Sequence, residues 1–308
     1  MRLENQAASA VLMVRPEHFA SNPDTLASNC FQRAAAASAE LKEAALREFE
    51  ALAAALSGAG IAVHVFPGGA EPASPDEVFP NNWLSTHADG SVVLYPLMAP
   101  SRRLERRAEL IAALSRNYRT SRIIDLSGSE RAGAFLEGTG SLVLDRPNHA
   151  AYASLSPRTS RAAIERFEAE LGYSVHVFQA VDSAGSAVYH TNVLMSLGSG
   201  FAVVCGAALR AASERRSLFS RLEASGRTVI DIDFGQMAAF AANLLELAAP
   251  SGPVAALSVR ALASLDPGRR RALERYAALL PVDVTTIETY GGGGVRCMLA
   301  EVHLPAAG

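Results

Sequence analysis

A run of glycines leads to a lone cysteine near the C-terminal end of the sequence. Residues 291–294 are all glycine, Val295 and Arg296 follow, and Cys297 then opens an apolar run over 298–302. Glycine is used where a backbone turns sharply or approaches a ligand closely. A thiol at the end of such a loop, anchored on a predicted strand, is placed as a nucleophile would be. A small buried side chain beside an ordinary turn is the alternative that this stretch alone leaves open.

A nucleophilic cysteine needs a base, and the base needs a group that orients it. Among the seven histidines, His190 is the main candidate because it opens a predicted apolar strand with Asn192 on the same face. His303, on an alternating strand after Cys297, is a minor candidate. Glu137 lies between an apolar pair and glycine, where a buried acid requires a specific partner. Structural roles for these side chains remain open from the residues alone.

Three loops carry polar side chains that could bind a substrate. Segment 75–83 holds two acids, paired amides and the only tryptophan, whereas 100–103 and 156–159 each place an arginine just before a predicted helix. An arginine fork can hold a carboxylate through two hydrogen bonds. Exposed polar loops and surface salt bridges are the alternatives. The candidate binding residues in these loops are Asp76, Asn81, Asn82, Arg102 and Arg158.

These residues must be positioned by elements that recur along the chain. Amphipathic helical patterns are each followed by a short β-branched run, and these runs begin at steps of 62, 52, 54 and 53 residues. The predicted helices cover residues 38–56, 103–118, 160–171, 211–225 and 268–280, and the runs begin near Ile61, Ile123, Val175, Val229 and Val282.

Further strand-like runs precede the helices. Segments 83–87 and 92–95 flank an Asp-Gly turn typical of a hairpin, and 188–195 with 201–205 form a similar pair. Each unit is therefore predicted to contain a strand, a second strand, a helix and a third strand, in that order. An extra helix is predicted over 236–247. Five such units favour an α/β repeat closed on itself, with a central pocket in which distant residues meet. We found no linker and expect one domain over residues 1–308.

Composition limits the partners of this chain. It has 308 residues, 49% of them hydrophobic, and a net charge of −3 without a basic run, so neither a nucleic-acid nor a membrane-surface partner is expected. Cys30, Cys205 and Cys297 are far apart, which argues against a metal pair or a disulfide framework. The first residues lack a signal-peptide core, so we expect a cytoplasmic location. The oligomeric state is left open and includes a homodimer.

Taken together, these motifs resemble those of the pentein superfamily of guanidino-group-modifying enzymes, over nearly the whole chain. The resemblance implies a five-bladed, pseudo-symmetric ββαβ propeller. The family's catalytic cysteine, histidine and acid fall on Cys297, His190 and Glu137. Segment 75–82 looks like the Phe-x-x-Asp substrate motif, and the two arginine segments look like the carboxylate-binding motifs of the dimethylarginine dimethylaminohydrolase branch.

Two departures from the deiminase pattern bear on the substrate. Asn82 stands where Phe-x-x-Asp has aspartate, and Asn192 stands where deiminases have His-x-Asp. An aspartate would hold a guanidinium by charge-assisted hydrogen bonds, whereas asparagine both donates and accepts. The replacement favours a neutral ureido group. Succinylarginine dihydrolase is similar in using asparagine and takes a guanidino substrate, although it passes through a ureido intermediate.

The sequence looks most like the arginine-deiminase-related branch proposed to hydrolyse citrulline. This resemblance implies a small amino-acid substrate, a covalent Cys297 intermediate, and no metal or organic cofactor. It implies that Arg102 and Arg158 hold the α-carboxylate, with Asp76 near the other polar end. Two alternatives remain: a hydrolase or deiminase of arginine or a modified arginine, and a non-catalytic binding protein on the same fold.

Overall fold

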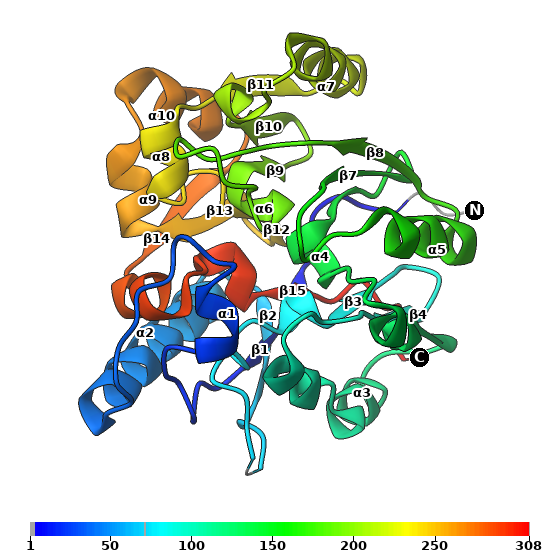
Figure 1. Ribbon diagram of the computed structural model, residues 1–308, viewed down its shortest axis with the longest axis vertical. Coiled ribbons are helices and arrows are strands. Elements are labelled where there is room, and N and C mark those ends of the chain that lie inside the picture. The colour runs from blue at the N-terminus through cyan, green and yellow to red at the C-terminus, as the bar shows by residue number, and fades with distance from the viewer. Residues whose placement is uncertain (1–3, 71, 308) are drawn as a thin grey trace.

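Five small sheets surround a central axis, with the longer helices at the periphery (Figure 1). The computed structural model describes residues 4–70 and 72–307, and within them each of the five sheets has three strands. In every sheet the middle strand pairs antiparallel with one neighbour and parallel with the other. The predicted five-bladed ββαβ architecture is confirmed.

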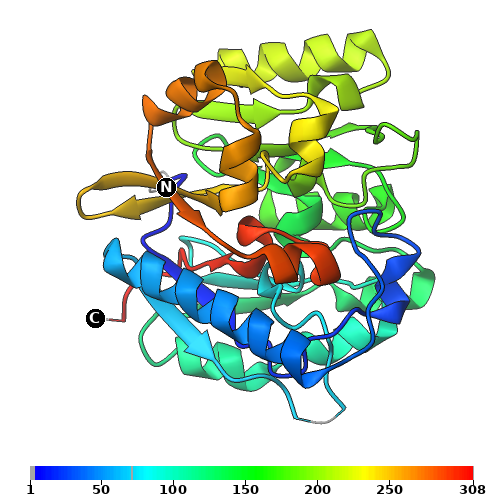
Figure 2. The ribbon, with the colours of Figure 1, turned by 90° about the vertical axis from the view of Figure 1, so that its left-hand side faces the viewer.

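Blade 1 joins the two ends of the described chain. Its middle strand β1 (Ala10–Val14) pairs with β2 (Ala62–Phe66) and, in the antiparallel direction, with β15 (Ala300–Glu301). Helix α2 (Ala39–Gly58) connects β1 to β2 and lies on the outside of the blade (Figure 2). Because β15 follows Cys297 directly, closing the ring also fixes the predicted nucleophile beside the axis.

The other blades follow chain order. Blade 2 contains β3 (Leu84–Thr86), β4 (Ser91–Leu94) and β5 (Arg122–Asp125), and blade 3 contains β6 (Val143–Asp145), β7 (Ala150–Ser154) and β8 (Ser174–Phe178). Blade 4 contains β9 (Met195–Leu197), β10 (Phe201–Val204) and β11 (Thr228–Asp231), and blade 5 contains β12 (Leu245–Ala249), β13 (Gly252–Ser258) and β14 (Ala278–Val282). Their outer helices are α3 (Ala108–Leu114), α5 (Arg161–Leu171), α7 (Ala212–Ala224), α9 (Val259–Ser264) and α10 (Pro267–Glu274).

Helix α2 shows why these sequences form amphipathic outer helices. Ser38 caps its N-terminus by accepting a hydrogen bond from Leu41 N. The side chains that it buries recur every three or four residues and therefore form one apolar face toward the sheets: Ala45, Phe49, Leu52 and Leu56. The face packs on apolar side chains of blades 1 and 5. None of the helices in the described residues is long and apolar enough to cross a bilayer.

Several predicted element boundaries are wrong. The helix predicted over 236–247 is α8 (Phe234–Ala238), and Phe240 adopts a φ of 62° that breaks it before β12 begins at Leu245. The predicted 268–280 helix ends at Glu274, so β14 starts at Ala278 rather than at Val282. The 103–118 helix is reduced to α3 and a preceding 3₁₀ turn, Pro100–Glu105.

The strand predicted over 188–195 is also wrong, except at Met195. Residues Thr191–Leu194 form a short helix, α6, and only then does β9 begin. His190 is the N-cap residue of α6, and Asn192 lies in its single turn, so the two do not share one face of a strand. Likewise, Cys297 lies in a 3₁₀ turn, Val295–Met298, before β15.

A buried ion pair links blades 3 and 4. Arg227, which precedes β11, donates from Nη1 and Nη2 to the Asp145 carboxylate at 2.8 and 2.9 Å, and from Nε to Gly198 O at 2.8 Å. Arg227 is 4% exposed and Asp145 is 1% exposed. Removing one member of a buried pair leaves the other charge without its partner in a region of low dielectric constant.

We therefore expect Arg227→Ala to lower the free energy of unfolding by about 3–5 kcal/mol, measured by urea denaturation. The matched control is Arg270→Ala, which removes an exposed pair with Glu274 and should change stability by less than about 0.5 kcal/mol. Equal effects of the two substitutions would contradict the role assigned to the buried pair.

Candidate active site

Short turns at the inner ends of the blades carry the predicted site residues. The 3₁₀ turn Pro80–Asn82 precedes β3, α4 (Gly138–Ser141) precedes β6, α6 precedes β9, and Val295–Met298 precedes β15. The Pro80–Asn82 turn contacts both α4 and the Val295–Met298 turn, and α4 contacts α6. The pseudo-symmetry of the blades thus brings together residues that are more than 200 positions apart in the chain.

The Cys297 thiol is buried beside two amides. Cys297 is 3% exposed, and its Sγ lies 3.3 Å from Nδ2 of Asn243 and 3.6 Å from Nδ2 of Asn192. Burial raises the pKa of the Cys297 thiol, while the Asn243 hydrogen bond, the charge of Arg296 and the Asn192 hydrogen bond oppose that increase. The thiol is therefore protonated at rest.

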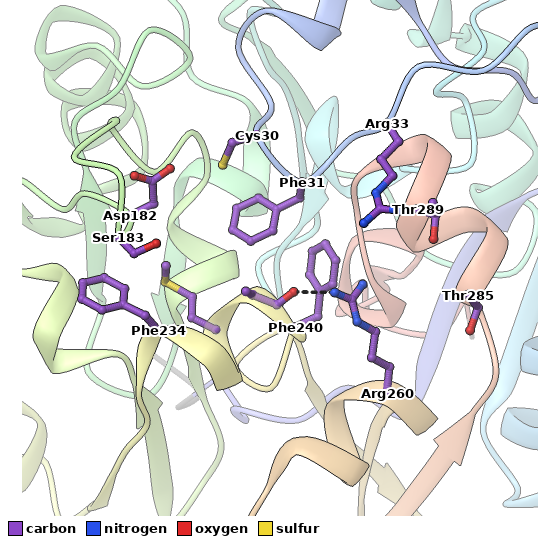
Figure 3. Close-up of a pocket in the computed structure, with 12 residues that line it drawn as sticks. Cys30, Phe31, Arg33, Asp182, Ser183, Phe234, Phe240, Arg260, Thr285 and Thr289 are labelled. Atoms are coloured by element: carbon purple, nitrogen blue, oxygen red, sulfur yellow. Dashed lines mark hydrogen bonds between the residues drawn. The ribbon is translucent and has the colours of Figure 1, made fainter.

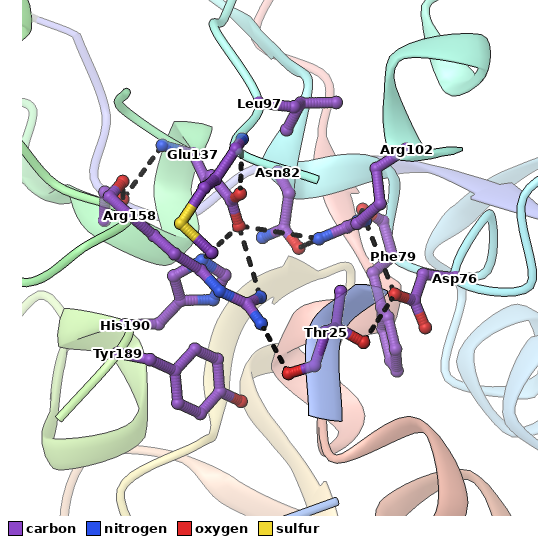
Figure 4. Close-up of polar contacts among 12 residues, drawn as sticks. Thr25, Asp76, Phe79, Asn82, Leu97, Arg102, Glu137, Arg158, Tyr189 and His190 are labelled. Carbon is purple, nitrogen blue, oxygen red and sulfur yellow. Dashed lines mark hydrogen bonds and ion pairs between the residues drawn. The ribbon is translucent and has the colours of Figure 1, made fainter. Parts of the chain in front are cut away.

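His190 and Glu137 form a close buried pair. His190 Nε2 lies 2.8 Å from Glu137 Oε2 (Figure 4), and both side chains are almost fully buried. Burial lowers the pKa of His190 to about 4, although the Glu137 hydrogen bond and charge act in the opposite direction. The histidine is thus neutral at neutral pH. A neutral imidazole can accept a proton, as a general base must.

Two arginines keep Glu137 ionised. Burial by itself would raise the pKa of Glu137, but Arg158, His190 and Arg102 more than offset this effect and hold the pKa below its ordinary value. Arg158 Nη1 lies 3.4 Å and Arg102 Nη1 lies 3.6 Å from Glu137 Oε2. Met98 N also donates to Glu137 Oε1 at 3.0 Å. The Glu137 carboxylate is therefore the anion that Arg158, His190 and Arg102 share.

The predicted carboxylate-binding arginines differ in their surroundings. Arg102 is bound on two sides, by Glu105 through Nε and Nη2 at 2.9 Å each and by Asn82 Oδ1 through Nη1 at 2.8 Å. Arg158 instead donates to Ser28 Oγ at 2.7 Å and to Thr25 O at 3.2 Å. Both arginines line the cavity at Cys297. Arg158 has the partners that a substrate carboxylate could replace more easily, since neither is an anion.

The neighbouring residues Asn81 and Asn82 lie at different positions relative to the cavity. Asn82 lines the cavity, whereas Asn81 lies behind it and accepts a hydrogen bond from Asn82 Nδ2 at 3.1 Å. Asn81 in turn donates to Thr139 at 3.3 Å. Asn81 therefore orients Asn82 and does not line the cavity, and its own contact with a substrate stays a prediction.

Asp76 also lines the cavity. Its Oδ2 accepts a hydrogen bond from Asn22 Nδ2 at 2.9 Å, while Oδ1 has no hydrogen-bond partner among the described residues. Burial raises the pKa of Asp76, and the positive charge of Arg102 opposes that effect. A cationic group in the cavity would supply the partner that Oδ1 lacks.

An N-terminal segment that sequence reasoning missed covers the site. Around α1 (Pro23–Leu26), Thr25 and Asn29 line the cavity, and Asn29 Nδ2 donates to Gly292 O at 3.1 Å. Tyr189 donates to the same oxygen at 2.5 Å. The cavity at Cys297 has a volume of only about 10 Å³, which is room for about one water molecule. The only local signal for this segment was the Asn-Pro-Asp helix start at residue 22.

The glycine run is required by close packing. Gly292 has a φ of +69°, and a Cβ on Gly291 or Gly293 would lie 2.8 or 2.9 Å from the Phe79 ring. The glycines therefore allow the loop to approach the Phe79 ring closely. His303 lies 3.1 Å from Glu301 in a separate buried cluster and is not a hydrogen-bond partner of Cys297 in the described chain.

A wider cavity lies on the other side of Phe31. Its volume is about 430 Å³, and Figure 3 shows Arg33 and Arg260 projecting into it beside Phe31 and Phe240. The Phe31 ring separates this cavity from Tyr189 of the catalytic cavity, with ring centroids 6.1 Å apart. The larger volume does not mark the reaction centre, because neither Cys297 nor His190 lines it. No cluster of His, Cys, Asp or Glu in the described residues could hold a metal ion.

Comparison with known proteins identifies the class. The chain is similar over 96% of its length to a dimethylarginine dimethylaminohydrolase structure bound to S-methyl-L-thiocitrulline, with 16% identity, a TM-score of 0.65 and 99% of that chain covered. It is similar over 96% of its length to the N-terminal domain of ArgZ, an arginine dihydrolase from cyanobacteria, with 17% identity, a TM-score of 0.74 and 98% of that domain covered. The fold is that of the pentein superfamily.

A third similarity is to AgrE in complex with ornithine and NAD⁺, with 17% identity, a TM-score of 0.72 and 97% of this chain covered. This chain spans 41% of full-length ArgZ and 40% of AgrE. No sequence among curated proteins matches it. Residues 15–304 match the family described as N,N dimethylarginine dimethylhydrolase, eukaryotic. The chain belongs to this family, within the arginine-modifying pentein superfamily of hydrolases.

The Glu137–His190 pair generates a prediction. Glu137→Gln removes the anion that stabilises a protonated His190, so the pKa of His190 should fall below its value of about 4. We expect kcat to fall at least about 100-fold, because general acid–base catalysis contributes that much. NMR titration of His190 together with steady-state kinetics measures both effects.

The matched control for this substitution is Glu246→Gln, a buried acid of β12 that accepts hydrogen bonds from Ser199. It lies outside the site and should leave kcat within about twofold, as for most changes away from the chemistry. A pKa of His190 that rises or stays unchanged in Glu137→Gln would contradict the assigned role of Glu137.

Proposed function

We propose that the protein is a cysteine-dependent hydrolase of a ureido amino acid, converting citrulline to ornithine, carbon dioxide and ammonia. The observation that carries this proposal is the orientation of Asn82. The atom that faces Arg102 Nη1 at 2.8 Å must be the amide oxygen, because arginine only donates. The amide nitrogen therefore lies on the other side, where one of its two N–H groups donates to Asn81 Oδ1 at 3.1 Å.

The glycine at position 140 supports this orientation. A Cβ there would lie 2.6 Å from Asn82 Nδ2 and 2.8 Å from His190 Nδ1, so the amide nitrogen and the imidazole flank the same space. A donor at this place favours a ureido carbonyl, which accepts. An aspartate would place an acceptor there and favour a guanidinium.

The remaining groups can bind the amino-acid end of the substrate. In this proposal Arg158 exchanges Ser28 and Thr25 for the substrate carboxylate, with Arg102 supplying additional positive charge. Asp76 Oδ1, which lacks a hydrogen-bond partner among the described residues, accepts from the substrate ammonium. Entry of the substrate then requires the N-terminal segment around α1 to move away, because the cavity is otherwise nearly filled.

The chemistry follows from the resting protonation states. The Cys297 proton passes to neutral His190, and the thiolate forms a bond to the ureido carbon. The carbonyl oxygen, now negative, accepts from Asn82. His190 returns the proton to the departing ornithine nitrogen as the carbon–nitrogen bond breaks, which leaves a carbamoyl thioester on Cys297.

The second half of the reaction uses water. His190 takes a proton from a water molecule whose oxygen attacks the carbamoyl carbon, and the carbon–sulfur bond breaks. The product carbamate decomposes to carbon dioxide and ammonia. Neither step needs a metal or an organic cofactor, and we propose that residues 1–308 act as one pentein domain.

Arginine is the second candidate substrate. The similarity to ArgZ, an arginine dihydrolase, favours it. In this proposal, hydrolysis of the guanidino group would come first and hydrolysis of the resulting ureido group second. A site suited to the ureido group is compatible with both reactions. The two candidates differ in whether the first, guanidino, step takes place.

Product stoichiometry tests the proposal directly. Citrulline incubated with the purified protein should yield ornithine and ammonia in equal amounts, measured together by amino-acid analysis and an ammonia assay. Arginine yielding one ornithine and two ammonia molecules would favour the second candidate. Ammonia without ornithine, or no product from citrulline, would overturn the citrulline assignment. Cys297→Ala provides the inactive control.

Asn82→Asp tests the basis of specificity. It replaces the amide donor with a carboxylate oxygen that repels a ureido carbonyl, so kcat/KM for citrulline should fall about 10–100-fold, the effect of losing about 1–3 kcal/mol. Binding of arginine, measured by calorimetry in a Cys297→Ala background, should strengthen relative to citrulline. An unchanged ratio of the two affinities would sink this account of Asn82.

A further inference from the structure

The nearest hydrogen-bond donor to the predicted nucleophile comes from a residue that no motif indicated. Asn243 Nδ2 lies 3.3 Å from Cys297 Sγ, closer than the 3.6 Å of Asn192 Nδ2. In the described chain, His190 makes no hydrogen bond with Sγ, so neutral amides provide the side-chain hydrogen bonds to the sulfur. Both Asn243 and Asn192 are at most 1% exposed.

Local structure holds the Asn243 amide in place. Asn243 N donates to Phe240 O at 2.8 Å, at the left-handed turn that separates α8 from β12. Its Nδ2 also donates to Asn192 O at 3.0 Å. One amide nitrogen therefore connects the start of blade 5, the α6 turn of blade 4 and the thiol. The side chain has little freedom to turn away.

Gly294 gives Asn243 the space that it occupies. A Cβ at residue 294 would lie 2.8 Å from Asn243 Oδ1 and 3.4 Å from Glu288 Oε1. Any larger residue would push the amide away from Sγ or displace the loop. The last glycine of the run is thus matched to Asn243, whereas Gly291 and Gly293 are matched to Phe79.

We propose that Asn243 is a catalytic residue whose amide is the principal hydrogen-bond donor to the Cys297 thiolate. The thiolate formed when His190 takes the proton is buried, and a buried anion without donors is strongly disfavoured. A fixed N–H donor stabilises the anion more than the neutral thiol, because hydrogen bonds to charged groups are stronger. Asn243 therefore lowers the barrier both for attack and for expulsion of the sulfur.

Charged and titratable side chains also lie near the Cys297 thiol. Arg296 is the adjacent cation, and its guanidinium also bonds Glu301 at 3.3 Å. Tyr189 lies nearby, and burial and the neighbouring Cys297 raise the pKa of its hydroxyl. His190, Asp76, Arg102 and Arg158 line the same cavity as Cys297. Among the described residues, none of these groups donates a hydrogen bond to the sulfur, which distinguishes the role of Asn243 from theirs.

The test measures the apparent pKa of Cys297 through the pH dependence of its alkylation by iodoacetamide, followed on the Cys297 peptide by mass spectrometry. Asn243→Leu keeps the size and removes the donor. We expect the pKa of Cys297 to rise by about one to two pH units, the effect of losing a charge-assisted hydrogen bond. In Asn243→Asp, the added carboxylate should raise the pKa further.

A merely structural role would lower stability without moving this pH profile. A folded Asn243→Leu protein with the wild-type pKa would overturn the proposal, as would an Asn243→Asp protein with a pKa at or below wild type if the leucine variant does not fold. Asn148→Asp, an exposed residue outside the site, should leave the profile unchanged. The assay needs no substrate, so it can succeed even if citrulline hydrolysis fails.

Discussion

The structure around the axis depends on one buried anion. Glu137 is fully buried, yet it is held ionised because Arg158, His190 and Arg102 surround it. Its hydrogen bond with His190 sets the direction of the imidazole, and its charge lies between the guanidinium groups of Arg158 and Arg102. Arg102, Arg158 and His190, from blades 2, 3 and 4, meet at this carboxylate, so one buried anion fixes the geometry of the site.

Around that anion, the reacting groups are neutral at rest. Burial raises the pKa of the Cys297 thiol and lowers that of His190, so both directions favour the uncharged pair. The side chains that donate hydrogen bonds to the sulfur are neutral amides, Asn192 and Asn243. In the proposed function, such neutral donors suit a neutral ureido group. The alternative of preformed thiolate and imidazolium would place two further charges in a buried region that already contains Glu137, Arg102 and Arg158.

Sequence reasoning succeeded where the signal was local or repeated. Helical periodicity identified the outer helices, and the regular step between units predicted the closed five-bladed fold. It failed where tertiary contacts override local preference. The apolar run after His190 reads as a strand, but its first residues form α6 because the turn must meet α4 at the axis. The helix predicted over 236–247 ends early since Phe240 adopts a left-handed conformation that no propensity signals.

What the sequence determined by itself is the fivefold repeat and the candidate side chains that it carries, namely Cys297, His190 and Glu137. It could not determine which atoms meet. The orientation of Asn82, the place of Asn81 behind it, the cover formed by the segment around Thr25 and the contact of Asn243 with the sulfur were decided only by the fold. The physical reason is that hydrogen bonding and desolvation act over a few ångströms between residues from different blades, and sequence distance contains no information about such contacts.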